Sequence, residues 1–192
     1  IARGDARLFR IATSTYEVAI LIENPNINGI VTRAPYTFKI YSGTSKLPIQ
    51  TIIGSTYIGR NSSFVVFKGP FNLTESPNMK AVFEWGSLVW EKSSDIQPIV
   101  AVDNMNLIVG PATPRLEASL VNRSQTNAFN IEAVALLSDV NGNVVAVGKT
   151  FVDSLKIGES APIVFSWPEA FATEPVAIKI IPHLLPDKSY IN

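Results

Sequence analysis

The chain has 192 residues, of which 46% are hydrophobic and 17% charged, so it can bury a core and is not intrinsically disordered. Sixteen basic and sixteen acidic residues cancel without a basic stripe, which argues against nucleic acid as a partner. Cysteine is absent, which excludes disulfides, thiol nucleophiles and cysteine-based metal sites.

The 192 residues themselves are not predicted to contact a membrane. No apolar run reaches the length of a membrane span, and no signal peptide is present. The sequence opens at Ile1 without an initiator methionine, so we expect a mature or excised segment. Any membrane attachment is then expected through an anchor outside this chain.

The first half predicts strands separated by turn residues. Val18, Ile20 and Ile22 alternate with more polar positions, as on one face of a strand, and Pro25 ends that strand. Residues 68–78 hold two prolines and a glycine and are predicted as a loop. The predicted strands of this half are residues 8–11, 16–23, 36–41, 49–58, 63–67 and 79–90.

Polar residues 91–97 form the predicted boundary, which divides the chain into domains at residues 1–93 and 96–192. Beyond it, Asn141-Gly142 lies between two apolar runs and predicts a hairpin with a type I′ turn, which needs positive φ at both central residues. Pro182 and Pro186 are expected to end the fold. The predicted strands here are residues 98–109, 115–121, 128–137, 143–152, 161–165 and 176–181.

Segments of the two halves match in order, with an offset of roughly one immunoglobulin-like domain. Strands that end at Asn24 and Asn122 correspond, and so do the strand segments Gly54–Ile58 and Gly148–Val152. No sustained helical period occurs. We therefore predict an all-β fold made of two tandem immunoglobulin-like antiparallel β-sandwich domains.

The second half has a characteristic spacing of turn residues and glycines: Asn122, Leu137-Ser138-Asp139, Gly148-x-Thr150 and Leu155-x-x-Gly158. Over roughly residues 114–170, this spacing resembles that of the FxLYD domain. Leu137-Ser138-Asp139 stands where that family has Leu-Tyr-Asp, and Ile157 stands where it has proline.

The first half contains Glu23-Asn24-Pro25-Asn26, Ala34-Pro35-Tyr36 and Gly54-x-Thr56. In these segments it is similar to the N-terminal part of uncharacterised bacterial proteins from candidate phyla, and distantly to the late-embryogenesis-abundant type 2 (WHy) sandwich. These resemblances imply a membrane-anchored, extracytoplasmic, non-enzymatic adhesion or scaffold module. Neither family supplies a catalytic residue.

Motifs for chemistry are not found. His183 is the only histidine, and no serine or aspartate nearby makes a catalytic triad plausible, so no catalytic residue and no cofactor is predicted. Asp139-x-Asn141-x-Asn143 matches the first half of a calcium loop. Val144 and Thr150 then stand where glycine and glutamate are needed, so the hairpin is preferred and no metal site is predicted.

Three function classes remain open. The first is a structural or interaction protein that binds a protein partner, or itself, through exposed edge strands. The second is a module that binds small ligands or carbohydrates through exposed aromatic residues, with Trp167 and Phe171 as the candidate site. An enzyme with a site assembled from distant acids is the third alternative. Trp85 and Trp90 are the other tryptophans available to a sugar-stacking platform.

Overall fold

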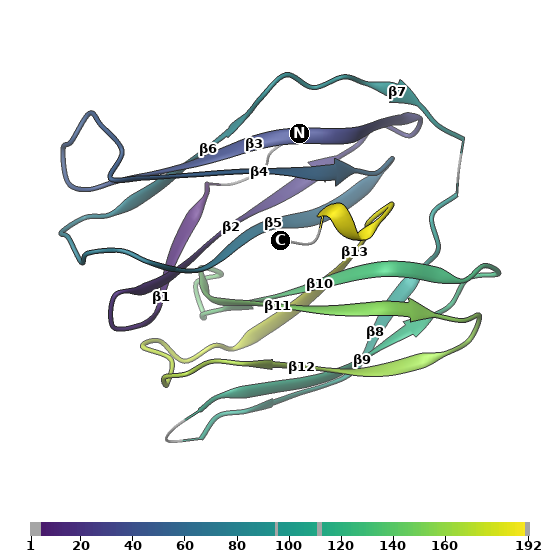
Figure 1. Cartoon of the computed structure of the whole chain (residues 1–192). Coiled ribbons are helices and arrows are strands. Elements are labelled where there is room, and N and C mark those ends of the chain that lie inside the picture. Colours follow the sequence, from purple (N-terminus) through teal and green to yellow (C-terminus); the bar gives the residue numbers. More distant parts are fainter. Residues whose placement is uncertain (1–4, 95, 111–112, 191–192) are drawn as a thin grey trace. The chain divides into compact units, whose positions relative to one another are not determined.

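The structure is a computed structural model that describes residues 5–94, 96–110 and 113–190. Those residues fall into two compact units, residues 5–94 and 96–190, which are described separately. All the sheets are antiparallel and the only helix of the described residues is one short 3-10 turn, so the predicted all-β sandwich fold is confirmed (Figure 1). The division into two independent domains stays a prediction.

The first unit contains two main sheets and a short ribbon. One sheet has the order β1-β2-β5, the other has the order β4-β3-β6, and β7 pairs with the start of β3. The strands are β1 (Arg7–Ala12), β2 (Thr15–Asn24), β3 (Gly29–Tyr41), β4 (Gln50–Ile58), β5 (Ser62–Asn72), β6 (Lys80–Trp85) and β7 (Glu91–Lys92).

The second unit repeats the two main sheets with the same connectivity. Its sheets have the orders β8-β9-β12 and β11-β10-β13, so β9 corresponds to β2 and β10 to β3. The elements are β8 (Val100–Ile108), β9 (Arg115–Asn122), β10 (Ala128–Ser138), β11 (Val144–Leu155), β12 (Ser160–Ser166), β13 (Ala177–Leu184) and η1 (Lys188–Tyr190).

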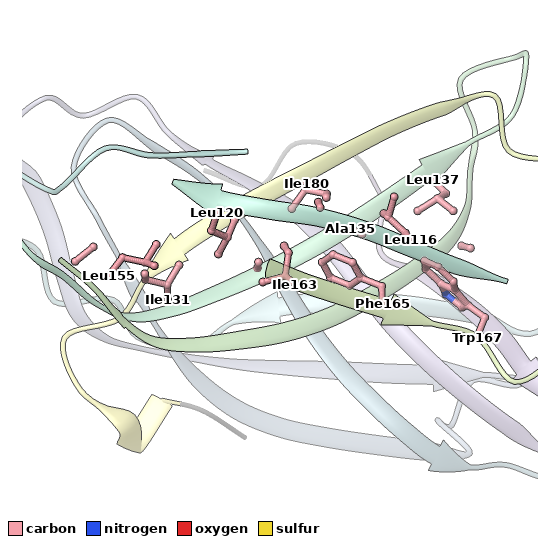
Figure 2. Packing of buried hydrophobic residues seen from close by; sticks show 14 residues of the cluster. Leu116, Leu120, Ile131, Ala135, Leu137, Leu155, Ile163, Phe165, Trp167 and Ile180 are labelled. Atoms are coloured by element: carbon pink, nitrogen blue, oxygen red, sulfur yellow. The ribbon is translucent and has the colours of Figure 1, made fainter. Parts of the chain in front are cut away.

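Alternating residues of the facing sheets form the core of each unit, because successive side chains of a strand point to opposite faces. In the first unit, the buried core includes Val18, Ile20, Ile22, Tyr36, Phe38, Ile58, Phe64 and Val66. In the second unit, it includes Leu116, Leu120, Ile131, Ala135, Leu137, Leu155, Ile163, Phe165, Trp167 and Ile180 (Figure 2). The predicted inward face of β2 is confirmed.

The hairpin between β10 and β11 lies where it was predicted, but its turn is of another type. Only Gly142 of the central pair has positive φ, at 78°. The Asp139 N–H donates to the Asn143 carbonyl (2.9 Å) and the Gly142 N–H donates to the Asp139 carbonyl (3.0 Å). These bonds enclose a three-residue loop with a register shift behind it, which is a type I turn with a bulge rather than type I′.

Two strands are longer than the sequence predicted because their partners continue. β3 begins at Gly29, where it pairs with β7, rather than at residue 36. β5 continues through Pro70 to Asn72, which pairs with Thr15, so residues 68–72 are strand rather than loop. Gly69 and Pro70 of β5 lie opposite the single residue Glu17 of β2, and this bulge accommodates the proline.

Two predicted strand ends are also wrong. The strand predicted over residues 79–90 ends at Trp85. The Gly86 N–H still donates to the Pro35 carbonyl (2.8 Å), but proline has no N–H to donate in return, so the pairing stops there and the chain continues to β7. Pro182 does not end the fold but lies inside β13, opposite Ala133. β13 is at the edge of its sheet, where one side of the strand needs no N–H donor.

Candidate functional site

Trp167 is a core residue, so the structure corrects its expected role in an exposed ligand platform. Its side chain is 4% exposed, and its indole N–H donates to the Val147 carbonyl (2.7 Å). Figure 2 shows the ring at the end of the buried cluster, beside Phe165. The partly buried Phe171 meets it edge-on with ring centroids 5.1 Å apart, so the pair packs on itself and on the core.

Trp85 belongs to a second aromatic cluster, inside the first unit. Its ring meets Phe83 edge-on at 4.8 Å and Tyr36 at 6.4 Å, and Phe38 completes the group. Its indole Nε1 is buried and has no hydrogen-bond partner within the described part of the chain. Aromatic pairs of this geometry stabilise a core beyond the area that they bury.

Trp90 has a different environment, because it is 40% exposed and lines an open hollow of about 600 Å³. The other lining residues come from the turn after β2, the start of β3 and β7: Asn26, Ile27, Asn28, Gly29, Glu91 and Lys92. A Cβ built on Gly29 would lie 3.2 Å from the Trp90 ring, so one part of the indole rests on the Gly29 backbone.

The backbone that frames this hollow is held at several points. The buried Asn24 amide donates to the Gly29 carbonyl (2.9 Å) and accepts from the Asn26 N–H (3.1 Å). On the other side, the Ser93 N–H donates to the Asn28 carbonyl (2.9 Å). The turn and β7 therefore form a connected frame around Trp90, which sequence reasoning did not find because β7 lies in the stretch predicted as linker.

His183 lies on β13, opposite Glu132 of β10. The same Glu132 carboxylate forms an ion pair with the Lys149 ammonium at 3.4 Å. Within the described ranges, no group of three histidine, aspartate or glutamate side chains could hold a metal ion. The same residues include no helix long and apolar enough to span a membrane.

Asp139 uses its carboxylate inside the hairpin loop. Oδ1 accepts the backbone N–H groups of Asn141 (2.9 Å) and Asn143 (2.8 Å), and Oδ2 accepts the side-chain amide of Asn143 (3.3 Å). These bonds, led by the backbone N–H of Asn143, hold the pKa of the Asp139 carboxyl below its ordinary value of 3.8. The Asp-x-Asn-x-Asn pattern thus closes a turn.

The edges of the main sheets differ in how they are protected against pairing with another strand. Charged residues or prolines within an edge strand normally prevent such pairing. Seven edge strands of the main sheets carry at least one: β1, β5, β6, β8, β11, β12 and β13. The exception among the described strands is β4, whose nine residues include neither.

Apolar side chains are exposed at the first half of this unprotected edge. Ile53 within β4 is 75% exposed, and Leu47 in the loop before β4 is 77% exposed. Ile49, the residue before β4, is also exposed. β4 pairs only with β3 among the described strands, so the backbone groups on its other side have no strand partner.

No comparison with known proteins indicates the function of this chain. No protein-family model matches the chain, and no curated protein matches it. Among solved structures, the exo-chitosanase CsxA of Amycolatopsis orientalis is similar at 13% identity, with a TM-score of 0.35 and 95% of this chain covered. The chain spans about a quarter (26%) of the length of that enzyme. A likeness this distant carries no argument about function.

Proposed function

We propose that this chain is a non-catalytic module for protein–protein interaction, adhesion or structural assembly, which binds its partner by strand addition to β4. The observation that carries the proposal is the contrast among sheet edges: β4 lacks the charges and prolines present in the other edge strands of the main sheets. An exposed, uncharged edge strand is a template for an incoming strand.

The chemistry of β4 indicates what kind of segment it accepts. Within residues 50–55, Thr51 and Ile53 are exposed and no residue is charged, so an incoming strand meets backbone groups and the exposed Ile53 side chain. A partner segment that is extended, uncharged and rich in β-branched residues fits this edge. A second copy of β4 meets the same requirements without like-charge repulsion, so self-association is one form of the same function.

The proposed location is extracytoplasmic, at the cell surface or membrane-anchored. The resemblance of the second half to the FxLYD domain, carried by Asn122, Gly148 and Gly158, supports this location. The anchor would lie outside the chain described here. The alternative function, a carbohydrate-binding module, draws its support from the hollow at Trp90 rather than from Trp167 and Phe171.

The experiment introduces one charge into the open edge. Phage-displayed extended peptides are selected against the chain, and its self-association is measured by sedimentation velocity over a range of concentrations. We expect binding by uncharged β-branched peptides, or reversible dimerisation, that shifts the NMR amide signals of residues 50–55. Ile53→Lys should weaken that binding at least about tenfold, because a lysine on an edge strand disfavours the close approach and pairing of a second strand.

Val82→Lys is the matched control. Val82 is an exposed residue of β6, at the opposite edge of the same sheet, and it pairs with Lys39 of β3. It should leave partner binding unchanged. The proposal is abandoned when neither peptides nor a second copy bind, or when both lysine variants weaken binding equally.

A further inference from the structure

We propose that the hollow at Trp90 is a binding site for a neutral, hydroxyl-rich sugar ring. The inference goes beyond the protein-interaction function, because the hollow is built from β7 and the turn after β2 rather than from the β4 edge. A volume of about 600 Å³ accommodates one or two sugar rings, since small-molecule sites range from roughly 300 to 1,000 Å³.

Polar side chains at the hollow have unused hydrogen-bonding capacity. Within the described part of the chain, the amide groups of Asn26 and Asn28 and the indole N–H of Trp90 form no hydrogen bond with protein. An amide both donates and accepts, as a sugar hydroxyl does, so each asparagine matches a hydroxyl group in either direction. The partly exposed indole offers an apolar ring on which the C–H face of a sugar packs.

The backbone around these side chains is already fixed. The carbonyl of Asn26 accepts the Asn61 N–H (2.8 Å), and Gly29 pairs with Lys92 in the short ribbon. The Glu91 carboxylate accepts the Thr32 hydroxyl (2.8 Å), which holds β7 against β3. A ligand therefore meets an ordered frame, and less of its binding free energy is lost in ordering the loop.

Charge favours a neutral ligand. Glu91 and Lys92 both line the hollow and carry opposite charges, so the site has no net charge to attract an ion. The loop after β9, which corresponds to the turn after β2, is anchored by Asn122 in a similar way. β13 corresponds to β6, but the described residues after β13 contain the η1 turn and no strand equivalent to β7. Because β7 forms one side of the hollow, only the first unit is predicted to bind sugar.

The test uses the whole ¹⁵N-labelled chain. It is first screened on a glycan array of neutral hexoses, pentoses and N-acetylhexosamines, and then titrated by NMR with cello-, chito-, manno- and xylo-oligosaccharides. We expect at least one oligosaccharide to shift the indole N–H signal of Trp90 and leave that of Trp167 in place. Trp90→Ala should weaken binding about thirtyfold, as is usual for a tryptophan at the centre of a binding surface.

Two further variants keep the test independent of folding. Asn28→Ala removes an amide that forms no protein hydrogen bond in the described structure, and it should weaken binding about fivefold. Val89→Ala changes an exposed neighbour that does not line the hollow, and it should have no effect. The proposal is overturned when no array glycan or oligosaccharide shifts the Trp90 signal, when only extended peptides do, or when Trp90→Ala and Asn28→Ala bind as tightly as the wild type.

Discussion

Asn24 and Asn122 perform the same structural task in the two units. Each is 1% exposed at the end of the corresponding strands β2 and β9. The Asn24 amide donates to the carbonyls of Gly29 (2.9 Å) and Gly59 (2.7 Å). The Asn122 amide donates to the carbonyls of Thr126 (2.8 Å) and Leu155 (3.0 Å). In both units, one buried asparagine side chain therefore connects two segments. One is the chain that leads from its own strand into the next, and the other is the end of β4 or β11 in the facing sheet.

Substitution of Asn122 tests this role. Asn122→Ala leaves two carbonyls and the Ser124 N–H without their partner, so the free energy of unfolding should fall by about 3 kcal/mol. Asn122→Asp should cost more at neutral pH, because a carboxylate would face the two carbonyl oxygens. Burial should raise the pKa of that introduced carboxyl, so its destabilising effect should shrink as the pH falls and the carboxyl becomes neutral.

Urea unfolding monitored by the fluorescence of Trp167, which lies in the same unit, measures these changes. Arg123→Ala is the control, since the adjacent Arg123 forms an exposed ion pair with Asp103 and should cost under about 1 kcal/mol. Equal stabilities of the alanine variants at residues 122 and 123 would contradict the role assigned to Asn122.

Two corresponding strand glycines are predicted to respond differently to alanine. A Cβ at Gly54 would lie 2.5 Å from Cζ of Tyr36, whose ring is confined between other aromatic rings. Gly54→Ala should therefore lower stability by about 2 kcal/mol, because the overlap outweighs the entropy gained from removing a glycine. At Gly148 the nearest atom, Cζ2 of Trp167, is 3.1 Å away, so a small shift relieves the contact and Gly148→Ala should be nearly neutral. Thermal unfolding of both variants compares the two costs, and a greater loss at Gly148 would contradict the packing argument.

Trp167 is predicted to contribute to stability rather than to sugar binding. Trp167→Phe keeps an aromatic ring but leaves the buried Val147 carbonyl without its donor, so we expect a loss of about 2 kcal/mol. Trp167→Ala should cost about 4 kcal/mol, because it also opens a cavity beside Phe165. Chemical denaturation measures both losses. A sugar titration of Trp167→Phe that shows weakened binding in a fully folded protein would restore the ligand role.

The pH dependence of the β10–β11 hairpin is predicted to depend on Asp139. Hydrogen bonds, led by the Asn143 N–H, lower the pKa of this carboxyl in the folded state. Its stabilising contribution is therefore fully present above its ordinary pKa of 3.8 and is lost as the pH falls through the lower folded value. NMR titration of the Asp139 carboxyl should give a midpoint below 3.8, and Asp139→Ala should remove the acid-dependent opening of amides in residues 139–143. An unshifted midpoint would show that the hydrogen bonds do not favour the charged form.

Local patterns determined most of the architecture. Alternation in residues 16–23 specifies the inward face of β2. A shift of one residue in the pairing register would move every hydrophobic side chain of the strand to the opposite face of the sheet. The order of Asn24, Gly54, Asn122 and Gly148 indicated the repeat. The two asparagines occupy the same hydrogen-bonding position at the ends of β2 and β9, and each of the two glycines lies against an aromatic side chain. The all-β fold follows from the alternation and the turn residues, and the place of the hairpin follows from Asn141-Gly142.

Contacts between distant segments decided the rest. Strand limits at Gly29 and Asn72 depend on partners in β7 and β2, and Pro182 is tolerated because β13 is an edge. The three tryptophans have the same side chain but lie in different environments. Trp85 packs in an aromatic cluster, Trp90 is partly exposed at the hollow, and Trp167 is buried in the core, because each ring contacts different strands. The sequence by itself thus determines the residue types, their spacing and the local turns. Which strands lie at sheet edges, which side chains are buried and where the hollow at Trp90 lies are decided only when strands far apart in the chain pair and stack. No local pattern connects the residues that make those contacts.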